Sequence, residues 1–402
     1  MKHRLYIIVF MLLSAIFVSG CWDRAELQHL NLVSAIGIDE GGDDVENRYL
    51  VTVQIVNVGK IGGSQGQGGK TEGTPVTTFS DTGSTVAEAL RKISPKTPNQ
   101  LFFPHVQLMV IGEELAGNNG IQDLFDWLER DSHFRNLFPI LIVRNNTAKN
   151  ALQITTSLEN IPSANIVGRL NTAKENWGEY VNTRADQVIR QLSGDVVYIS
   201  GIQIIGDSEK GNSLKNIDQI SPKTAMEIKG LAIFNKGKLK RWLYGEEARG
   251  ALWINNELSN TIVNLNCEKR KKGIAVDVKR SKTKVALEIK NDKPVFYLSV
   301  RSEGSISEVQ CPIDLSKHKT IEKLQEQLAK EIKEEIVLAI KAGQEQKNDI
   351  FHFGEYINRE DPKLWKKIKK EWNNEIFPET EINVNVQAFI RRTGLRTKPY
   401  IK

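Results

Sequence analysis

Cysteine is scarce in this sequence, which has three among its 402 residues: Cys21, Cys267 and Cys311. So small a number excludes the disulfide framework of a small cysteine-rich secreted domain. We interpret Cys267 and Cys311 as two separate buried thiols. The alternative is a bridge between them, which an exported protein can form.

Metal-binding patterns are missing as well. The histidines at positions 29, 105, 133, 318 and 352 are isolated from one another, and the sequence has no His-Glu-x-x-His arrangement. A catalytic zinc needs three protein ligands brought together, often with two histidines at helical spacing. We therefore predict no metal site and no cofactor, and interpret these histidines as structural.

Paired catalytic carboxylates are not evident either. The sequence does contain three adjacent acidic pairs: Glu113–Glu114, Glu246–Glu247 and Glu334–Glu335. Neighbouring residues on a helix point in different directions, whereas glycan cleavage needs two carboxyls that face one bond. We interpret the three pairs as solvated helix faces and predict no catalytic residue.

One glycine-rich segment invites comparison with a phosphate-binding loop. Residues 64–71 end in Gly-Lys-Thr, but Ser64 stands where the first glycine is required. The residues that follow end in Pro75 and cannot open the helix whose N-terminus would hold a phosphate. Residues 59–75 are therefore predicted to be a flexible loop.

Charge of one sign does not dominate. Lysine and arginine together number 55 against 49 aspartates and glutamates, and the formal charge of +6 is spread along the chain. That balance argues against a nucleic-acid-binding protein. The 26% charged and 40% hydrophobic residues are typical of a soluble domain.

A single long apolar run is present, from Leu5 to Val18, and it is interrupted only by Ser14. Its 14 residues fall short of the roughly 20 that a spanning helix needs. The run follows Lys2 and Arg4 and ends in Ser-Gly-Cys at position 21, which is typical of a secretory signal that is cut before a cysteine. We predict that Cys21 carries an S-diacylglycerol and an N-acyl group, because two or more chains give stable anchoring. The alternative is an uncleaved membrane helix beside a chance cysteine.

The remaining chain alternates strand and helix patterns, which predicts an α+β fold. Strands are expected at 30–39, 48–58, 76–80, 101–111, 139–143 and 196–205, with amphipathic helices near 85–93 and 121–128. A hairpin at 228–244 and a helix at 246–258 follow, then strands at 260–268, 274–289, 295–309 and 382–390, with helices at 321–340 and 363–372.

We therefore predict a three-domain ectodomain in which each domain has a mixed or antiparallel sheet and flanking helices. The predicted division is a signal peptide at 1–20, an N-terminal domain at 21–193, a middle domain at 194–259 and a C-terminal domain at 260–402. In the helix at 363–372, five lysines alternate with apolar residues. Such a helix can lie on anionic lipid, but we favour a helix packed on the core with its lysines in solvent.

Several segments together resemble the Ger(x)C family, the lipoprotein C subunits of spore germinant receptors. They follow the family's order along nearly the whole chain: 21–27, 36–39, 51–57, 89–94, 105–115, 230–234, 247–250, 349–354 and 390–394. His352 departs from the pattern, since a glycine is expected there.

The resemblance implies a lipoprotein anchored through Cys21 to the outer face of the spore inner membrane. It implies that the protein acts together with two polytopic subunits, A and B, to sense nutrients and start germination. It implies no catalytic residues. Two other readings remain open from the residues alone: a solute-binding lipoprotein of a transporter, and an exported hydrolase acting on spore cortex.

Overall fold

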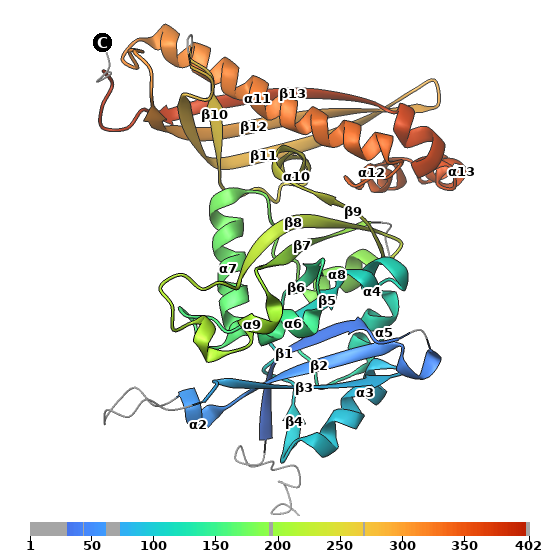
Figure 1. Ribbon diagram of the computed structural model, residues 1–402. Helices are drawn as coiled ribbons and strands as arrows, with labels where there is room; N and C mark the ends of the chain where they lie inside the picture. The colour runs from blue at the N-terminus through green and yellow to red at the C-terminus, as the bar shows by residue number, and fades with distance from the viewer. Residues whose placement is uncertain (1–29, 43, 62–72, 193–195, 268–269, 399–402) are drawn as a thin grey trace, which may run out of the picture.

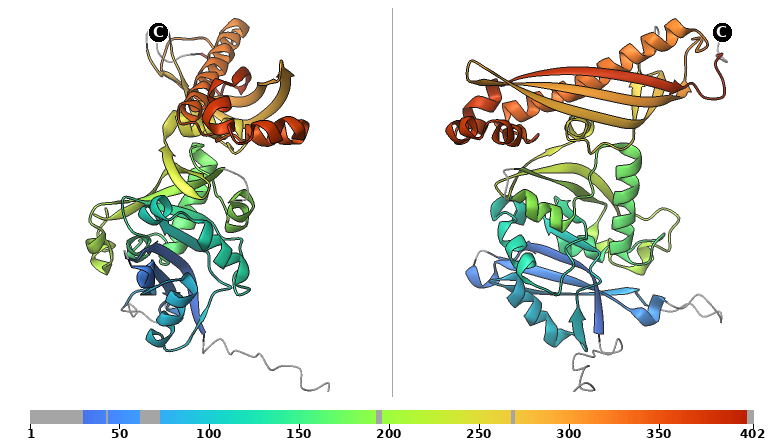
Figure 2. Two further views of the ribbon diagram at one scale, coloured as in Figure 1. Left: turned by 90° about the vertical axis from the view of Figure 1, so that its right-hand side faces the viewer. Right: turned by 180° about the vertical axis from the view of Figure 1, so that it is seen from behind.

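The computed structural model describes residues 30–42, 44–61, 73–192, 196–267 and 270–398. Two β-sheets lie one above the other along the molecule, and helix α10 (Gly245–Ile254) lies between them (Figures 1 and 2). The predicted α+β fold with flanking helices is confirmed.

The first sheet has nine strands within the described residues, in the order β3-β2-β1-β5-β6-β7-β8-β9, with β4 paired to β1. Its centre, β1, β5, β6 and β7, is parallel, and the strands on either side are antiparallel. The strands are β1 (Leu30–Glu40), β2 (Tyr49–Val56), β3 (Val76–Gly83), β4 (Gln100–Phe102), β5 (Leu108–Gly112), β6 (Ile140–Arg144), β7 (Val196–Ile205), β8 (Ala225–Asn235) and β9 (Lys238–Leu243).

Helices cover both faces of this sheet, because the parallel strands are joined by helical crossovers. On one face lie α3 (Val86–Ile93), α4 (Glu113–Asn118), α5 (Gln122–Arg130) and α8 (Ala185–Leu192). On the other lie α6 (Ala148–Gln153) and α7 (Pro162–Trp177). The short helices α2 (Val58–Ile61) and α9 (Ser208–Gly211) belong to connecting loops.

The second sheet contains β10 (Thr261–Leu265), β11 (Ile274–Lys290), β12 (Lys293–Val309) and β13 (Glu381–Arg392), in that order. The long helix α11 (His318–Glu345) packs on one face, and α12 (Phe353–Glu360) and α13 (Pro362–Ile368) follow it. The sheet is mixed, within the predicted mixed or antiparallel arrangement, since β13 runs parallel to β12 while the other pairs are antiparallel. The reason is that α11 carries the chain back to the end where β12 begins, so the last strand restarts in the same direction.

Two further details differ from the sequence prediction. The strand expected at 101–111 is two short strands, β4 and β5, because a turn at Pro104 interrupts it. The strands of residues 194–259 extend the first sheet, since β7 pairs with β6. They therefore form no sheet of their own, and the proposed boundaries at 193/194 and 259/260 stay a prediction.

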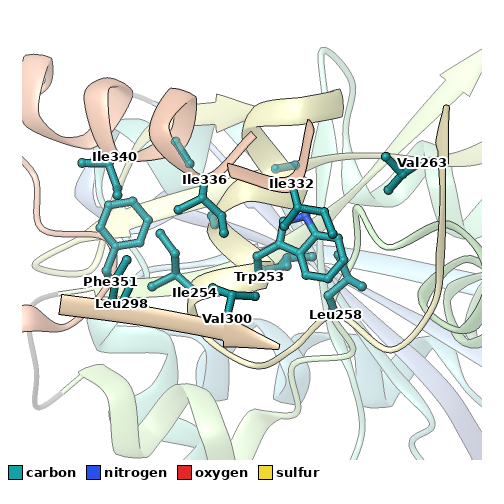
Figure 3. Close-up of a cluster of buried hydrophobic side chains, with 14 of the residues drawn as sticks. Trp253, Ile254, Leu258, Val263, Leu298, Val300, Ile332, Ile336, Ile340 and Phe351 are labelled. Carbon is teal, nitrogen blue, oxygen red and sulfur yellow. The ribbon is translucent and has the colours of Figure 1, made fainter. Parts of the chain in front are cut away.

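A single apolar core joins the two sheets. Trp253 and Ile254 of α10 lie among Ile332, Ile336 and Ile340 of α11 (Figure 3). Leu298 and Val300 of β12 complete this side of the cluster. Residues of β7, β8 and β9 belong to the same cluster, so α10 connects the two sheets through continuous packing.

The contact between α10 and α11 depends on Gly250. A Cβ atom there would lie 2.1 Å from the Glu335 carbonyl oxygen, whereas a Cβ on Gly168 in α7 would meet nothing within 4 Å. We expect Gly250→Ala to lower the free energy of unfolding by about 1–3 kcal/mol through overpacking. Gly168→Ala should raise it by roughly 0.5–1 kcal/mol, because alanine favours a helix interior. Urea unfolding of both variants tests this, and shifts of the same sign would contradict it.

Candidate functional site: the junction between the sheets

The carboxyl ends of the parallel strands are where open α/β sheets bind ligands. Here that edge is filled by Asp39, at the end of β1. Its two carboxylate oxygens accept hydrogen bonds from the backbone N–H groups of Ala148, at 2.7 Å, and Lys149, at 2.9 Å. Burial raises the pKa of Asp39, and these two bonds oppose the rise. The carboxylate thus occupies the start of α6, the position that a phosphate would take.

Arg249 on α10 and Glu335 on α11 form the main charged contact at the junction. Arg249 Nε lies 3.2 Å from each carboxylate oxygen of Glu335, and the two side chains are 13% and 7% exposed. The indole N–H of Trp253 donates to Glu335 at 2.8 Å. Glu179, just after α7, lies 3.6 Å from Arg249. This network therefore ties α10 to α11 and to the helical layer of the first sheet.

Neutral hydrogen bonds continue the contact between the two halves of the chain. Asn255, which ends α10, donates to the Tyr198 hydroxyl on β7 at 2.6 Å. Burial raises the pKa of Tyr198 well above its usual range. On the other side of α10, Thr283 of β11 donates to the Trp253 carbonyl at 2.7 Å. Polar side chains thus fix α10 to both sheets.

The acidic pairs do not all lie on solvated helix faces. That prediction is wrong for Glu335, which is buried, while its neighbour Glu334 is exposed. It is also wrong for Glu113, which is half-buried and accepts from the indole N–H of Trp242 at 2.6 Å. Glu247 pairs with Arg241 at 2.8 Å. The acidic side chains that are buried or half-buried therefore accept hydrogen bonds from tryptophan or arginine side chains.

The histidines have local contacts of their own. His105 stacks near Phe102, His133 lies 2.7 Å from Asp131, and His318 lies 3.1 Å from Glu322. His29 lies outside the described residues. Across the part of the chain that the structure describes, no three histidine, cysteine or acidic side chains gather as a metal-binding group.

His352 adopts a left-handed backbone with φ 59° at the start of α12. Glycine takes that conformation without a steric cost, which agrees with the glycine expected there from the sequence.

Cys267 and Cys311 form a disulfide, with their Cα atoms 6.4 Å apart. The interpretation of two separate thiols is therefore wrong. In the second sheet, Leu265 of β10 lies opposite Ile274 of β11, which lies opposite Val309 of β12. This pairing brings the two cysteines, each two residues past its strand, to the same end of the sheet.

The lysine-rich segment packs as a core helix. Leu364 and Trp372 are buried, and Trp365 and Ile368 pack against the core. Its lysines are exposed to solvent, which favours the core-packed interpretation over a helix that lies on lipid. Within the described residues, no helix has the length and apolar character needed to cross a bilayer. The predicted signal at 1–20, Cys21 and the glycine-rich residues 64–71 all lie outside the described residues.

Together these features define a two-sheet α+β protein in which the buried polar side chains hold its two halves together. Residues 23–204 match the family described as spore germination protein N-terminal domain, and residues 229–394 match spore germination B3/GerAC like, C-terminal. The chain therefore belongs to this spore germination family, and the predicted Ger(x)C membership is confirmed. It is a family of germinant receptor subunits and not of enzymes.

Full-length relatives agree with the match. Spore germination protein KC of Bacillus subtilis (strain 168) is 35% identical over 402 residues, covering 99% of this chain and 98% of the relative. Spore germination protein B3 of the same organism is 25% identical over 393 residues, covering 96% and 97%. The crystal structure of the GerBC protein has the same fold, with a TM-score of 0.56 at 21% identity, covering 89% of this chain and 96% of that chain.

Proposed function

We propose that this chain is the membrane-anchored lipoprotein subunit of a spore nutrient germinant receptor, and that it is required to start germination. The observation that supports this most is the similarity to spore germination protein KC along the entire chain. A solute-binding lipoprotein would be expected to show two α/β lobes of repeated parallel strands. The second sheet, with three antiparallel strands followed by one parallel strand, differs from that pattern.

The proposed anchor is Cys21, modified with an S-diacylglycerol and an N-acyl group, at the outer face of the spore inner membrane. Each buried methylene contributes about 0.8 kcal/mol, and two or more chains hold a protein stably on a bilayer. The disulfide between Cys267 and Cys311 supports export, because such bonds persist outside the reducing cytoplasm.

The proposed mechanism is contact with two polytopic receptor subunits, of the A and B types. A subunit shifts its partners between closed and open states only if it binds the two states unequally. Anchoring in the same membrane raises its effective concentration near those partners. Both effects require a surface that is complementary to the partner subunits, and neither requires a catalytic step.

Replacement of the lipid acceptor tests the proposal. We expect Cys21→Ala to abolish lipid labelling and to remove the nutrient response of this receptor, while other receptors in the same spore still respond. Mass spectrometry of the N-terminus and germination of mutant spores measure the two outcomes. Trp22→Phe is the matched control, since it leaves the thiol in place. A normal lipid-modified N-terminus, or a full nutrient response in Cys21→Ala spores, would contradict the proposal.

A further inference from the structure

A second polar region lies beside the junction and is not explained by packing. It is a cleft of about 820 Å³ lined by the turn of the β8–β9 hairpin, by the end of α8 and by residues between 347 and 374, from the end of α11 to just past α13. Five cationic side chains line it: Arg190, Lys236, Lys347, Lys369 and Lys370. Two acidic residues, Asp349 and Glu355, line it as well.

The four lysines have no carboxylate partner within 4 Å in the described chain, whereas Arg190 pairs with Asp186 at 3.0 Å. The two acids bind other residues of the cleft wall and not the lysines. Asp349 is buried and accepts from the Gly354 N–H at 2.7 Å and the Trp372 indole at 2.9 Å. The His352 imidazole beside Glu355 lowers the pKa of that carboxyl. The four lysines outnumber the two acids, so positive charge is in excess along the cleft.

Two of these lysines are held close together from opposite walls. Asn235 at the end of β8 donates to the Asn348 side-chain oxygen at 2.7 Å. Lys236 follows the first of these asparagines and Lys347 precedes the second, so the hydrogen bond brings both lysine backbones to one place. Both lysine side chains are exposed, and an anion bound between the two walls would be attracted by both charges.

Lys236 and Lys347 both have a backbone conformation that lysine rarely adopts. Lys236 has φ 50° and Lys347 has φ 52°, in the left-handed region that glycine or asparagine occupies at lower cost. A hairpin turn and a helix end account for that conformation but do not require lysine. Strained residues of this kind gather at ligand sites. The turn and the helix end therefore do not explain why a positively charged residue occupies each position.

We propose that this cleft binds a small soluble anion with at least two negative charges, carried on phosphate or carboxylate oxygens. Lys236 and Lys347 contact it from the two walls, and Lys369 and Lys370 contact it from the end of α13. Strand β1, the first described element, lies at the opposite end of the molecule from α12 and α13 (Figures 1 and 2). With the chain anchored at Cys21, as in the proposed function, this placement favours a soluble anion over a lipid headgroup.

Titration calorimetry on the full-length protein in detergent, at fixed ionic strength, tests the site with inorganic pyrophosphate and malonate as probes. We expect saturable binding of one anion per chain. Lys369→Gln with Lys370→Gln should weaken it at least tenfold. Lys366→Gln with Lys367→Gln makes the same charge change three residues earlier, on α13 and outside the cleft lining, and should change affinity less than twofold.

Lys236→Gly separates binding from folding. Glycine relieves the left-handed strain, so the free protein should unfold at a higher temperature while its affinity for pyrophosphate falls. The proposal is overturned if the wild type binds neither probe or if both double variants weaken binding equally. It is also overturned if only a hexaglutamate peptide binds, since the cleft would then accept an acidic protein segment instead.

Discussion

Replacing Glu335 with alanine is expected to lower the free energy of unfolding by about 3–5 kcal/mol. The change takes the nearer of two carboxylates from the nearly buried Arg249, which keeps Glu179 at 3.6 Å, and also removes the acceptor of the Trp253 indole N–H. Removing one partner of a buried, hydrogen-bonded ion pair costs more than the pair itself contributes. Urea unfolding followed by circular dichroism measures the loss.

Glu334→Ala is the matched control. Glu334 is the adjacent residue on α11, and its contact with Lys330 is long, at 3.7 Å, and exposed. Exposed pairs contribute little, so the control should stay within about 0.5 kcal/mol of the wild type.

A second variant tests the origin of the loss. Replacing both Arg249 and Glu335 with methionine removes both charges, and we expect it to recover part of the stability. Equal losses for Glu335→Ala and Glu334→Ala would show that the buried pair has no special role.

The buried pair also shows what helical spacing in the sequence indicates about Glu335 and what it leaves undetermined. Leu328, Ile332 and Ile336 follow the helical spacing that predicted α11, and Glu335 lies within that apolar face. A carboxylate on a core-facing side requires a buried donor. Its partner, Arg249, lies in a different helix 86 residues away. Periodicity thus indicates that Glu335 needs a partner but does not say which residue supplies it.

Local patterns predicted the elements that are themselves local. The apolar run at 196–205 matches β7, and the helix expected near 85–93 matches α3, which begins after Thr85 because the Thr85 side chain accepts from the Glu88 N–H. Helix α12 was missed, since its buried residues, Phe353, Gly354 and Ile357, are too few for a clear periodic signal. The pairing of β7 with β6 joins segments separated by three helices, and the spacing of residues along the chain does not indicate it.

The same limit explains the error about the cysteines. Cys267 and Cys311 are 44 residues apart, and only the registers of β10, β11 and β12 place them at one end of the sheet. Two cysteines in a long chain give no spacing pattern from which a bridge can be read. The bond follows from the strand order, which becomes known only with the fold.

Removing this disulfide should produce a loss of similar size to that of Glu335→Ala. A bridge over a separation of 44 residues restricts the unfolded chain, so replacing both cysteines with serine should lower the free energy of unfolding by about 2–4 kcal/mol. Urea unfolding with and without dithiothreitol measures it. The reductant should destabilise the wild type by the same amount and leave the double serine variant unchanged. Two free thiols in the exported protein, found by mass spectrometry, or a wild type indifferent to reductant, would refute the bridge and remove its support for export.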